Sequence, residues 1–233
     1  MSSKGNRRHV KRLAAGAYAG IARKAAKYAI KPRPGRHFLE NSIALASLIR
    51  DKLGYAGTLK EALRAIKQGS IEINGKVVTD AKQAVGYGDI IKIIPTEEYF
   101  QIGISRQGAV SAEKVGPGAK RIAKVIGKYV AKANTHMVRL HDGTSLRIPQ
   151  GIEVSTNDSV LLNKNKIEHV LKLEPGAGCI IYNGRHTGEK GTIKSIAKGN
   201  ALSRALATVE TASGSVQTLL DNIIVTGASD AKQ

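Results

Sequence analysis

Hydrophobic and polar residues follow helical spacing between residues 43 and 69. The apolar-rich stretch Ile43–Leu53 predicts a helix that stops at Gly54. Thr58 predicts the start of a second helix, because Glu61 stands at the spacing of a capping box. Gly69 suits the position just after the end of that helix, where a left-handed backbone is common. We therefore expect two short helices joined by a tight connection.

The pattern changes to alternation after residue 70, which predicts strands. Ile71–Ile73 alternates, Asn74-Gly75 is the strongest short-range hairpin signal, and Lys76–Val78 is the returning strand. Gly88-Asp89 then precedes a further apolar strand, Ile90–Ile94. A compact unit of helices, hairpin and strand is expected here.

From residue 96 onward, short strands alternate with turns. The period of residues 120–132 suits a helix or a strand, and its length does not separate the two. Asn200–Glu210 has a helical composition, whereas the alternation around Ala207–Thr211 and the pair Ser213-Gly214 indicate a hairpin. About five short strands after Gly176 predict a small barrel. The other predicted strands are Met137–Leu140, Ser145–Ile148, Val160–Leu162, Ile167–Leu173, Cys179–Tyr182, Thr192–Ile196 and Ile223–Val225.

Charge is distributed unevenly along the 233 residues, which carry a formal net charge of +19. The first 36 residues hold eleven basic side chains and no acidic one, whereas residues 41–100 are nearly neutral. Like charges packed this densely repel one another unless a polyanion or its counter-ions are near. Nucleic acid is the polyanion that the pattern favours, because each neutralised phosphate releases a condensed counter-ion. We expect residues 1–37 to form an extended or partly helical arm.

Several other classes of function are disfavoured. The single cysteine, Cys179, cannot form an internal disulfide, fits a reducing cytoplasmic compartment and is expected to be a small core residue. The six histidines contain no i,i+4 pair, so no metal or other cofactor is expected. No apolar run reaches the ~18 residues of a membrane span. Aromatic residues make up 4% of the chain, which disfavours a platform for stacked single-stranded bases.

Catalysis has little support in the sequence. His141 and Asp142 are adjacent in a turn, where neighbouring side chains point apart, and no glycine-rich nucleotide loop is present. The signatures of pseudouridine synthases and tyrosyl-tRNA synthetases are also absent. We therefore expect a protein that is not an enzyme and has no small-molecule substrate.

One face of the second predicted helix is basic. Lys60, Arg64 and Lys67 recur at i, i+4 and i+7, and Lys76 follows in the hairpin. Such a surface offers phosphate contacts at a rigid spacing, which suits a folded RNA backbone. An ordinary solvated helix beside an ordinary hairpin has the same charge and spacing, so these alone do not separate the two interpretations.

The order of elements favours the RNA-binding surface over the ordinary solvated helix and hairpin. The string from Thr58-Leu59-Lys60-Glu61-Ala62 through Gly69–Lys76 to Gly88–Ile91 resembles the alpha-L RNA-binding module of bacterial ribosomal protein four, pseudouridine synthases and some tRNA synthetases. Many members have Ser-Arg where this chain has Thr58-Leu59, so Lys60 would replace the missing arginine. The strand Cys179–Tyr182 followed by Gly188–Ile193 resembles the KOW motif of ribosomal and transcription-elongation proteins.

The whole ordered set is similar to the archaeal and eukaryotic e-type of small-subunit ribosomal protein four, in its archaeal-length form. The set comprises Arg8–Leu13, Lys31–His37, the alpha-L string, His141–Gly143, the KOW-like loop and Leu220–Ile223. The resemblance implies an α+β fold in four parts. These are a basic N-terminal arm (1–41), a small helical/β alpha-L RNA-binding module (42–95), a central β-rich domain (96–172) and a C-terminal SH3-like small β-barrel with the KOW motif and a short tail (173–233).

The function that this resemblance implies is that of a structural constituent of the small ribosomal subunit, located in the cytoplasm. Its partners would be ribosomal RNA and neighbouring ribosomal proteins, with no membrane. The alternative is a transient RNA- or ribosome-binding factor in assembly or regulation. The expected RNA-binding residues are Arg7, Arg8, His9, Lys11, Arg12, Lys31, Arg33, Arg36, His37, Thr58, Lys60, Arg64, Lys67, Asn74, Lys76, Arg185, Gly188, Lys190 and Lys194.

Overall fold

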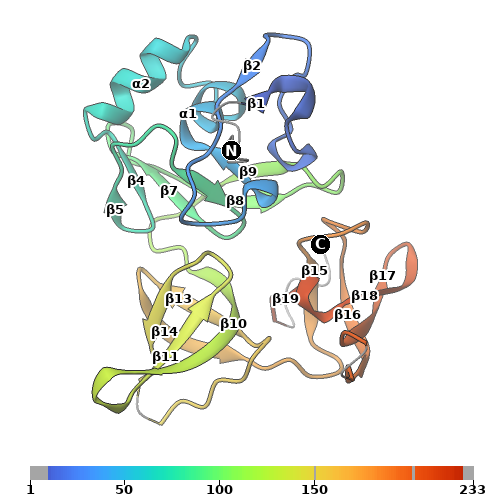
Figure 1. Cartoon of the computed structure of the whole chain (residues 1–233). Helices are drawn as coiled ribbons and strands as arrows, with labels where there is room; N and C mark the ends of the chain where they lie inside the picture. The colour runs from blue at the N-terminus through green and yellow to red at the C-terminus, as the bar shows by residue number, and fades with distance from the viewer. Residues whose placement is uncertain (1–9, 150, 201–202, 228–233) are drawn as a thin grey trace, which may run out of the picture. The chain divides into compact units, whose positions relative to one another are not determined.

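The chain divides into two compact units, each built mostly from β-strands (Figure 1). The computed structural model describes residues 10–149, 151–200 and 203–227. Unit 1 contains the described residues up to Gly103 together with Ala109–Val115. Unit 2 contains Ile104–Gly108 and the described residues from Gly116 onward.

The basic N-terminal segment is folded into unit 1. Strand β1 (Val10–Lys11) pairs antiparallel with β2 (Tyr28–Ala29), and two short 3-10 turns, η1 (Arg12–Ala14) and η2 (Ala17–Ala19), lie between them. Tyr18 in η2 is only 5% exposed. Residues 10–29 are therefore partly helical, as expected, but they also form a strand pair and a small packed substructure with a buried aromatic side chain.

The first predicted helix begins later than its apolar pattern suggested. Residues 42–44 form strand β3 (Ser42–Ala44), which pairs with β6 (Ala84–Gly86). The helical part starts at α1 (Leu45–Ser47) and continues as a π-helical turn, η4 (Leu48–Lys52). Its end at Gly54, which has a φ of 70°, agrees with the prediction. All three residues of β3 are buried against β6, and this long-range pairing overrides the helical pattern.

Helix α2 (Leu59–Lys67) is the second predicted helix, and both of its ends are confirmed. The Glu61 amide donates to Thr58 Oγ1 at 3.3 Å, and the Thr58 amide donates to Glu61 Oε2 at 3.2 Å. This capping box satisfies backbone donors that have no partner within the helix, a contribution of about 1 kcal/mol. Gly69 follows the helix with a φ of 75°. Ala62 and Ile66 are fully buried, so α2 packs through one face and exposes the other.

A five-stranded sheet in the order β5-β4-β7-β8-β9 completes unit 1. Asn74 and Gly75 have φ values of 51° and 81°, so both adopt the left-handed backbone of the predicted hairpin turn. Beyond that hairpin, β8 and β9 also belong to the sheet, so it continues past residue 95. The bounds are β4 (Ile71–Ile73), β5 (Lys76–Val77), β7 (Ile90–Ile93), β8 (Glu98–Ile104) and β9 (Val110–Val115).

The central sheet of unit 2 has the order β12-β11-β10-β13-β14. Residues 120–132, which the pattern left open, form the long strand β10 (Arg121–Ala131), because β10 pairs with β11 along one stretch and with β13 along another. The turn at His141–Gly143 joins β11 to β12 as predicted. The remaining elements are η5 (Lys132–Asn134), β11 (Thr135–Leu140), β12 (Ser145–Arg147), β13 (Ser159–Asn163) and β14 (Lys166–Leu171).

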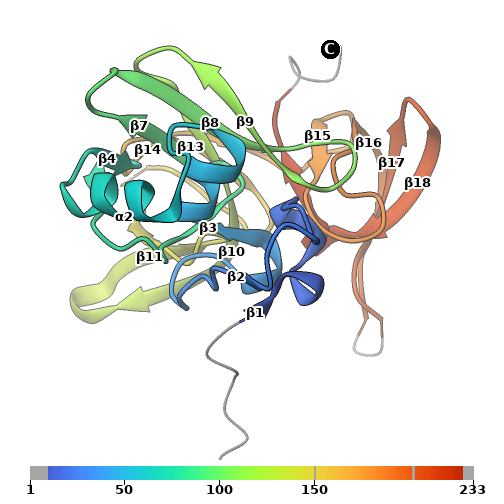
Figure 2. The ribbon, with the colours of Figure 1, turned by 90° about the horizontal axis from the view of Figure 1, so that it is seen from above.

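A second five-stranded sheet follows, in the order β18-β17-β16-β15-β19, and Figure 2 shows β15 to β18 of this sheet. Residues 206–219 form a hairpin and not a helix, as the alternation indicated. Cys179 is buried in the core of this sheet beside Ile193 and Val209, in agreement with its expected role. The bounds are β15 (Gly178–Ile181), β16 (Lys190–Ala197), β17 (Leu206–Thr211), β18 (Gly214–Leu219), η6 (Leu220–Asn222) and β19 (Ile223–Val225).

The two sheets of unit 2 are joined through buried polar contacts. Lys124 on β10 is 2% exposed, and its Nζ donates to the Leu220 carbonyl oxygen at 2.6 Å. The Val225 amide donates to Ser159 Oγ at 2.9 Å. Burial lowers the pKa of Lys124 to about 8, although Asp221 favours the charged form. The ammonium group therefore links the sheets at an energetic cost.

This lowered pKa predicts how stability depends on pH. Between pH 8 and 10.5 the unfolded chain binds more protons at Lys124 than the folded chain, so stability rises with pH across this window by about 3 kcal/mol. We expect Lys124→Met to remove this rise in stability with pH. Urea denaturation of the full chain at several pH values, with the unfolding of unit 2 followed, measures it. Lys166→Met, at an exposed position on β14, is the control and should retain the rise. An equal rise in Lys124→Met would contradict the prediction.

Candidate nucleic-acid interface

A basic groove in unit 1 brings together residues from three separate segments. Residues 29–33, helix α2 and residues 79–82 enclose a groove of about 360 Å³. Leu59 and Leu63 of α2 supply apolar surface, and cationic side chains come from all three segments. The lining consists of Ala29, Ile30, Lys31, Arg33, Leu59, Leu63, Lys67, Thr79, Asp80, Ala81 and Lys82.

Backbone and side-chain contacts hold the N-terminal segment against this groove. The Arg33 amide donates to the Lys82 carbonyl oxygen at 2.8 Å, and the Arg33 guanidinium pairs with Asp80 at 2.9 Å. Asp80 is the one acidic residue in the lining, against four basic residues. The groove consequently keeps a positive potential, which suits an anionic ligand.

The exposed face of α2 extends this positive surface. Lys60, Arg64 and Lys67 are exposed, and with Leu63 and Gln68 they line a second, shallow hollow. Leu63 and Lys67 line both hollows, so the two are continuous. Within the described part of unit 1, none of the three cations forms an ion pair. We name the exposed Lys60, Arg64 and Lys67 together the α2 face.

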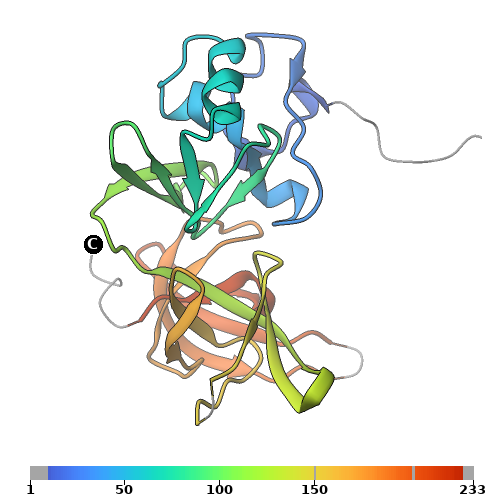
Figure 3. The same cartoon turned by 90° about the vertical axis from the view of Figure 1, so that its left-hand side faces the viewer.

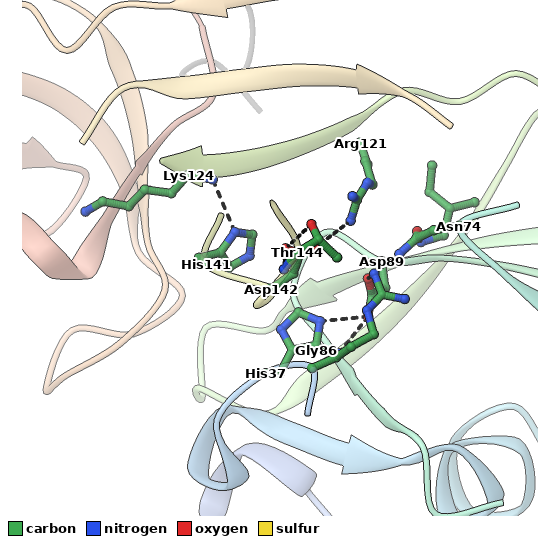
Figure 4. Close-up of polar contacts among 11 residues, drawn as sticks. His37, Asn74, Gly86, Asp89, Arg121, Lys124, His141, Asp142 and Thr144 are labelled. Carbon is green, nitrogen blue, oxygen red and sulfur yellow. Dashed lines mark hydrogen bonds and ion pairs between the residues drawn. The ribbon is translucent and has the colours of Figure 1, made fainter. Parts of the chain in front are cut away.

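A buried carboxylate positions the N-terminal segment beside the α2 face. Asp89 is fully buried, and its Oδ2 lies 2.8 Å from His37 Nε2 and accepts from the Gly86 amide at 3.1 Å (Figure 4). Its Oδ1 accepts from Asn74 Nδ2 at 2.6 Å and lies 3.6 Å from the Arg36 guanidinium. The Asp89 carboxylate thus joins three segments, which are residues 36–37, the hairpin turn at Asn74 and the start of β7.

The electrostatics of Asp89 follow from these partners. Burial by itself raises the pKa of the carboxyl group, but His37, Arg36 and Asn74 outweigh burial and hold it well below its usual range. His37 and Asn74 make contacts inside the protein, and their expected contact with RNA stays a prediction. The sequence indicated a Gly-Asp turn at this position but carried no sign that the Asp89 carboxylate is buried.

Arg12 is a further basic residue with partners inside the protein. Its guanidinium donates to the Ala22 carbonyl oxygen at 2.7 Å and to that of Tyr28 at 3.3 Å, and it lies 4.0 Å from Asp51. The side chain is buried, whereas its neighbour Lys11 is exposed. Of the expected arm residues, Arg7, Arg8 and His9 lie outside the described residues.

The glycine-bracketed loop of unit 2 is shaped by close backbone approaches. Gly188 has a φ of 91°, and a Cβ atom there would lie 2.1 Å from the Ser105 carbonyl oxygen. A Cβ atom at Gly191 would lie 2.2 Å from the Glu210 carbonyl oxygen. The Gly188 amide donates to the Ile181 carbonyl oxygen at 2.7 Å, so it is engaged within the protein. Both glycines are required by packing.

The basic residues around this loop differ in their surroundings. Arg185 and Lys190 are exposed, and Lys190 lines a hollow of about 630 Å³ together with Arg106 and Glu189. Lys194 is exposed too, but its Nζ pairs with Glu210 at 2.7 Å. In unit 1, Thr58 serves as the cap of α2, and Lys76 is exposed on the edge strand β5, outside both hollows.

The described ranges hold neither a metal-binding cluster nor a membrane-spanning helix. There, no three His, Cys, Asp or Glu side chains gather to hold a metal ion, and no helix has the length and apolar character needed to cross a membrane. Burial raises the pKa of the Cys179 thiol to about 12, so this thiol is not a nucleophile at neutral pH. Asp142 accepts from the Thr144 amide at 2.9 Å and pairs with Arg121 at 2.6 Å, as a turn residue does.

The chain is similar to known proteins over most of its length. Residues 4–40 match the RS4NT (NUC023) domain, and residues 45–91 match the S4 domain. The small ribosomal subunit protein eS4 of Aeropyrum pernix is 35% identical, over 97% of this chain and 94% of that protein. The protein of the same name from Archaeoglobus fulgidus is 34% identical, over 96% of this chain and 94% of that protein.

A solved structure shows the same fold. The crystal structure of the 30S ribosomal protein S4e from Thermoplasma acidophilum matches with a TM-score of 0.66 and 28% identity, and the match covers 82% of this chain and 97% of that chain. The fold and the domain matches define a ribosomal protein that carries an S4 domain. The chain belongs to the small ribosomal subunit protein eS4 family, which confirms the resemblance seen in the sequence.

The buried Asp89 yields a prediction about stability. Because its folded pKa lies below the unfolded value, its stabilising contribution is present above about pH 4 and is lost as the pH falls through the folded pKa. We expect Asp89→Asn to lower the free energy of local unfolding by about 3 kcal/mol at pH 7. Hydrogen exchange of the β4 and β7 amides measures this change.

The matched control for Asp89→Asn is Asp80→Asn. Asp80 pairs with Arg33 near the surface, where such pairs contribute less than about 1 kcal/mol. The effect of Asp89→Asn should shrink as the pH falls below about 4 toward the lowered folded pKa, whereas that of Asp80→Asn should stay small throughout. Equal protection of β7 in the two variants at pH 7 would refute the role assigned to Asp89.

The loop glycines give a second stability prediction. Gly191→Ala should lower the melting temperature of unit 2 and destabilise it by more than about 2 kcal/mol, because the new methyl group would overlap the Glu210 carbonyl. Gly116→Ala is the control, since no atom lies within 4 Å of a Cβ atom at that position. Calorimetry of the full chain compares the melting temperatures of the two variants. An unchanged melting temperature in Gly191→Ala would show that packing does not require this glycine.

Proposed function

We propose that this protein is a structural constituent of the small ribosomal subunit that binds ribosomal RNA by neutralising its phosphates, without catalysing a reaction. The observation that carries this proposal is the continuous surface formed by the basic groove and the α2 face in unit 1. Its cations come from segments distant in sequence, and Asp80 is the one acidic residue in the lining. The curated relatives are named for the small ribosomal subunit.

The geometry suits a folded RNA backbone. Lys60, Arg64 and Lys67 project from one helix, so the backbone spacing between these three cations is set before RNA binds. Lys31 and Lys82 add charge from the other two segments that line the groove. Contacts of this kind fix the position and orientation of the protein and do not read base sequence.

We also propose that the fold contains an alpha-L module and an SH3-like barrel with a KOW motif. Helix α2, the Asn74-Gly75 hairpin and β7 correspond to the alpha-L module, and β15 to β19 with the glycine loop correspond to an SH3-like barrel with a KOW motif. Arg185 and Lys190 would provide a second RNA contact there. The four-part division at residues 41, 95 and 172 stays a prediction. The protein would act in the cytoplasm beside other ribosomal proteins.

Sedimentation tests whether the protein is a built-in component. A cell extract is separated on a sucrose gradient, before and after a high-salt wash, and the protein is followed by immunoblot. We expect it to stay on the small subunit in a fixed ratio after the wash. Its loss into the light fractions would instead indicate a transient assembly or regulatory factor and would overturn the structural role.

The α2 face yields a binding prediction. The triple variant Lys60→Ala, Arg64→Ala, Lys67→Ala should weaken binding to small-subunit ribosomal RNA and flatten the plot of log affinity against log salt by about 2 to 3. Its melting temperature should not change, because all three side chains are exposed and form no ion pair within the described part of unit 1.

The control for the triple variant removes equal charge elsewhere. Lys164→Ala, Lys166→Ala, Lys172→Ala changes three exposed lysines of unit 2. Filter binding across a salt series compares the two. If both variants lose the same affinity and slope, the α2 face is not a specific contact; a collapse of the melting curve would assign its residues a structural role.

A further inference from the structure

Strands β10 and β11 form a ribbon that extends from the rest of unit 2, with η5 at its tip (Figure 3). Strand β12 pairs with the other edge of β11. The register aligns Tyr129, Met137 and Arg147 in one row across the three strands. Because directly paired residues share a face of the sheet, these three side chains lie on the same side.

That side faces away from the core. Val138 is fully buried in the core of the central sheet, and it alternates with Met137 and Arg139 along β11. Tyr129 is 45% exposed, and Arg139 and Arg147 are exposed. We name the outward surface formed by Tyr129, Met137, Arg139 and Arg147 the ribbon face.

The cations of the ribbon face are not neutralised by the protein. Residues 116–149 contain seven basic residues and one acidic residue, Asp142. Asp142 is buried and pairs with Arg121. In the described part of these strands, Arg121 pairs with Asp142 and Lys120 pairs with Glu168, whereas neither Arg139 nor Arg147 takes part in an ion pair.

A glycine keeps the centre of the ribbon face flat. Gly127 pairs with Arg139, and a Cβ atom at Gly127 would lie 3.8 Å from an Arg139 guanidinium nitrogen. The guanidinium group therefore lies over the backbone of β10, two residues from Tyr129. An aromatic ring, a planar cation and a second arginine are displayed together on a rigid sheet.

We propose that the ribbon face binds an unpaired segment of RNA, with one base stacked on Tyr129 and flanking phosphates paired with Arg139 and Arg147. A stacking ring selects for unpaired nucleotides, because bases within a helix already stack on their neighbours. The low aromatic content disfavoured an extended stacking platform, but one ring on the same sheet face as two arginines is sufficient for a single base. This site rests on the proposed RNA-binding function and is separate from the α2 face.

The test isolates the ribbon face within the full chain. The chain carries Lys60→Ala, Arg64→Ala, Lys67→Ala, and the probe is a short fluorescein-labelled oligoadenylate, compared with a duplex of the same length. Tyr129→Ala should weaken oligoadenylate binding about tenfold, and Tyr129→Phe, which keeps the ring, should change it by less than about twofold. Arg139→Gln, Arg147→Gln should flatten the salt slope by about 1.4. Lys172→Gln, Arg204→Gln removes equal exposed charge as the control.

The outcomes separate the two proposals. If Tyr129→Ala binds like Tyr129→Phe, or the arginine pair behaves like its control, the ribbon face is not an RNA site. If RNA affinity is unchanged but the arginine pair lowers incorporation into small subunits, the face contacts a protein, and the proposal is overturned. Failure of the unaltered chain to bind any RNA would instead overturn the proposed function itself, and with it the ribbon site.

Discussion

The burial of the Asp89 carboxylate is the constraint on which unit 1 depends. A buried charge is strongly unfavourable unless it is paired and fully hydrogen-bonded. Its partners come from the N-terminal segment through His37, from the hairpin turn through Asn74 and from the backbone of Gly86. These three segments can satisfy the carboxylate only by meeting at one point. Residues 29–33 are thereby held beside α2, and the basic groove is a consequence.

Basic residues of this protein fall into two populations with different physical roles. Arg12, Arg121 and Lys124 are buried and donate to carbonyl or carboxylate oxygens inside the protein, so they are not available for direct contact with RNA. Other cations, such as Arg64 and Lys67, remain exposed without an ion pair in the described part of their unit. The large net charge therefore overstates the charge available to RNA, and the effective surface is smaller and better defined.

Local signals in the sequence predicted the elements that depend on nearby residues. The capping box at Thr58 and the Asn74-Gly75 turn act over three or four residues, so α2 and the β4–β5 hairpin were predicted correctly. Strand β3 and strand β10 were missed or left open, because their partners β6 and β13 lie tens of residues away. At these two segments, long-range strand pairing overrides the local propensity.

By itself the sequence determined the charge pattern, the local helices and turns, and the family to which the chain belongs, because these depend on residue identity and short spacings. The tertiary structure alone decided which polar and basic side chains are available to a partner. It placed His37 and Asn74 inside the protein, and it aligned Tyr129 with two arginines on an exposed sheet. The physical reason is that desolvation and strand register are set by segments far apart in sequence, so no local pattern reports them.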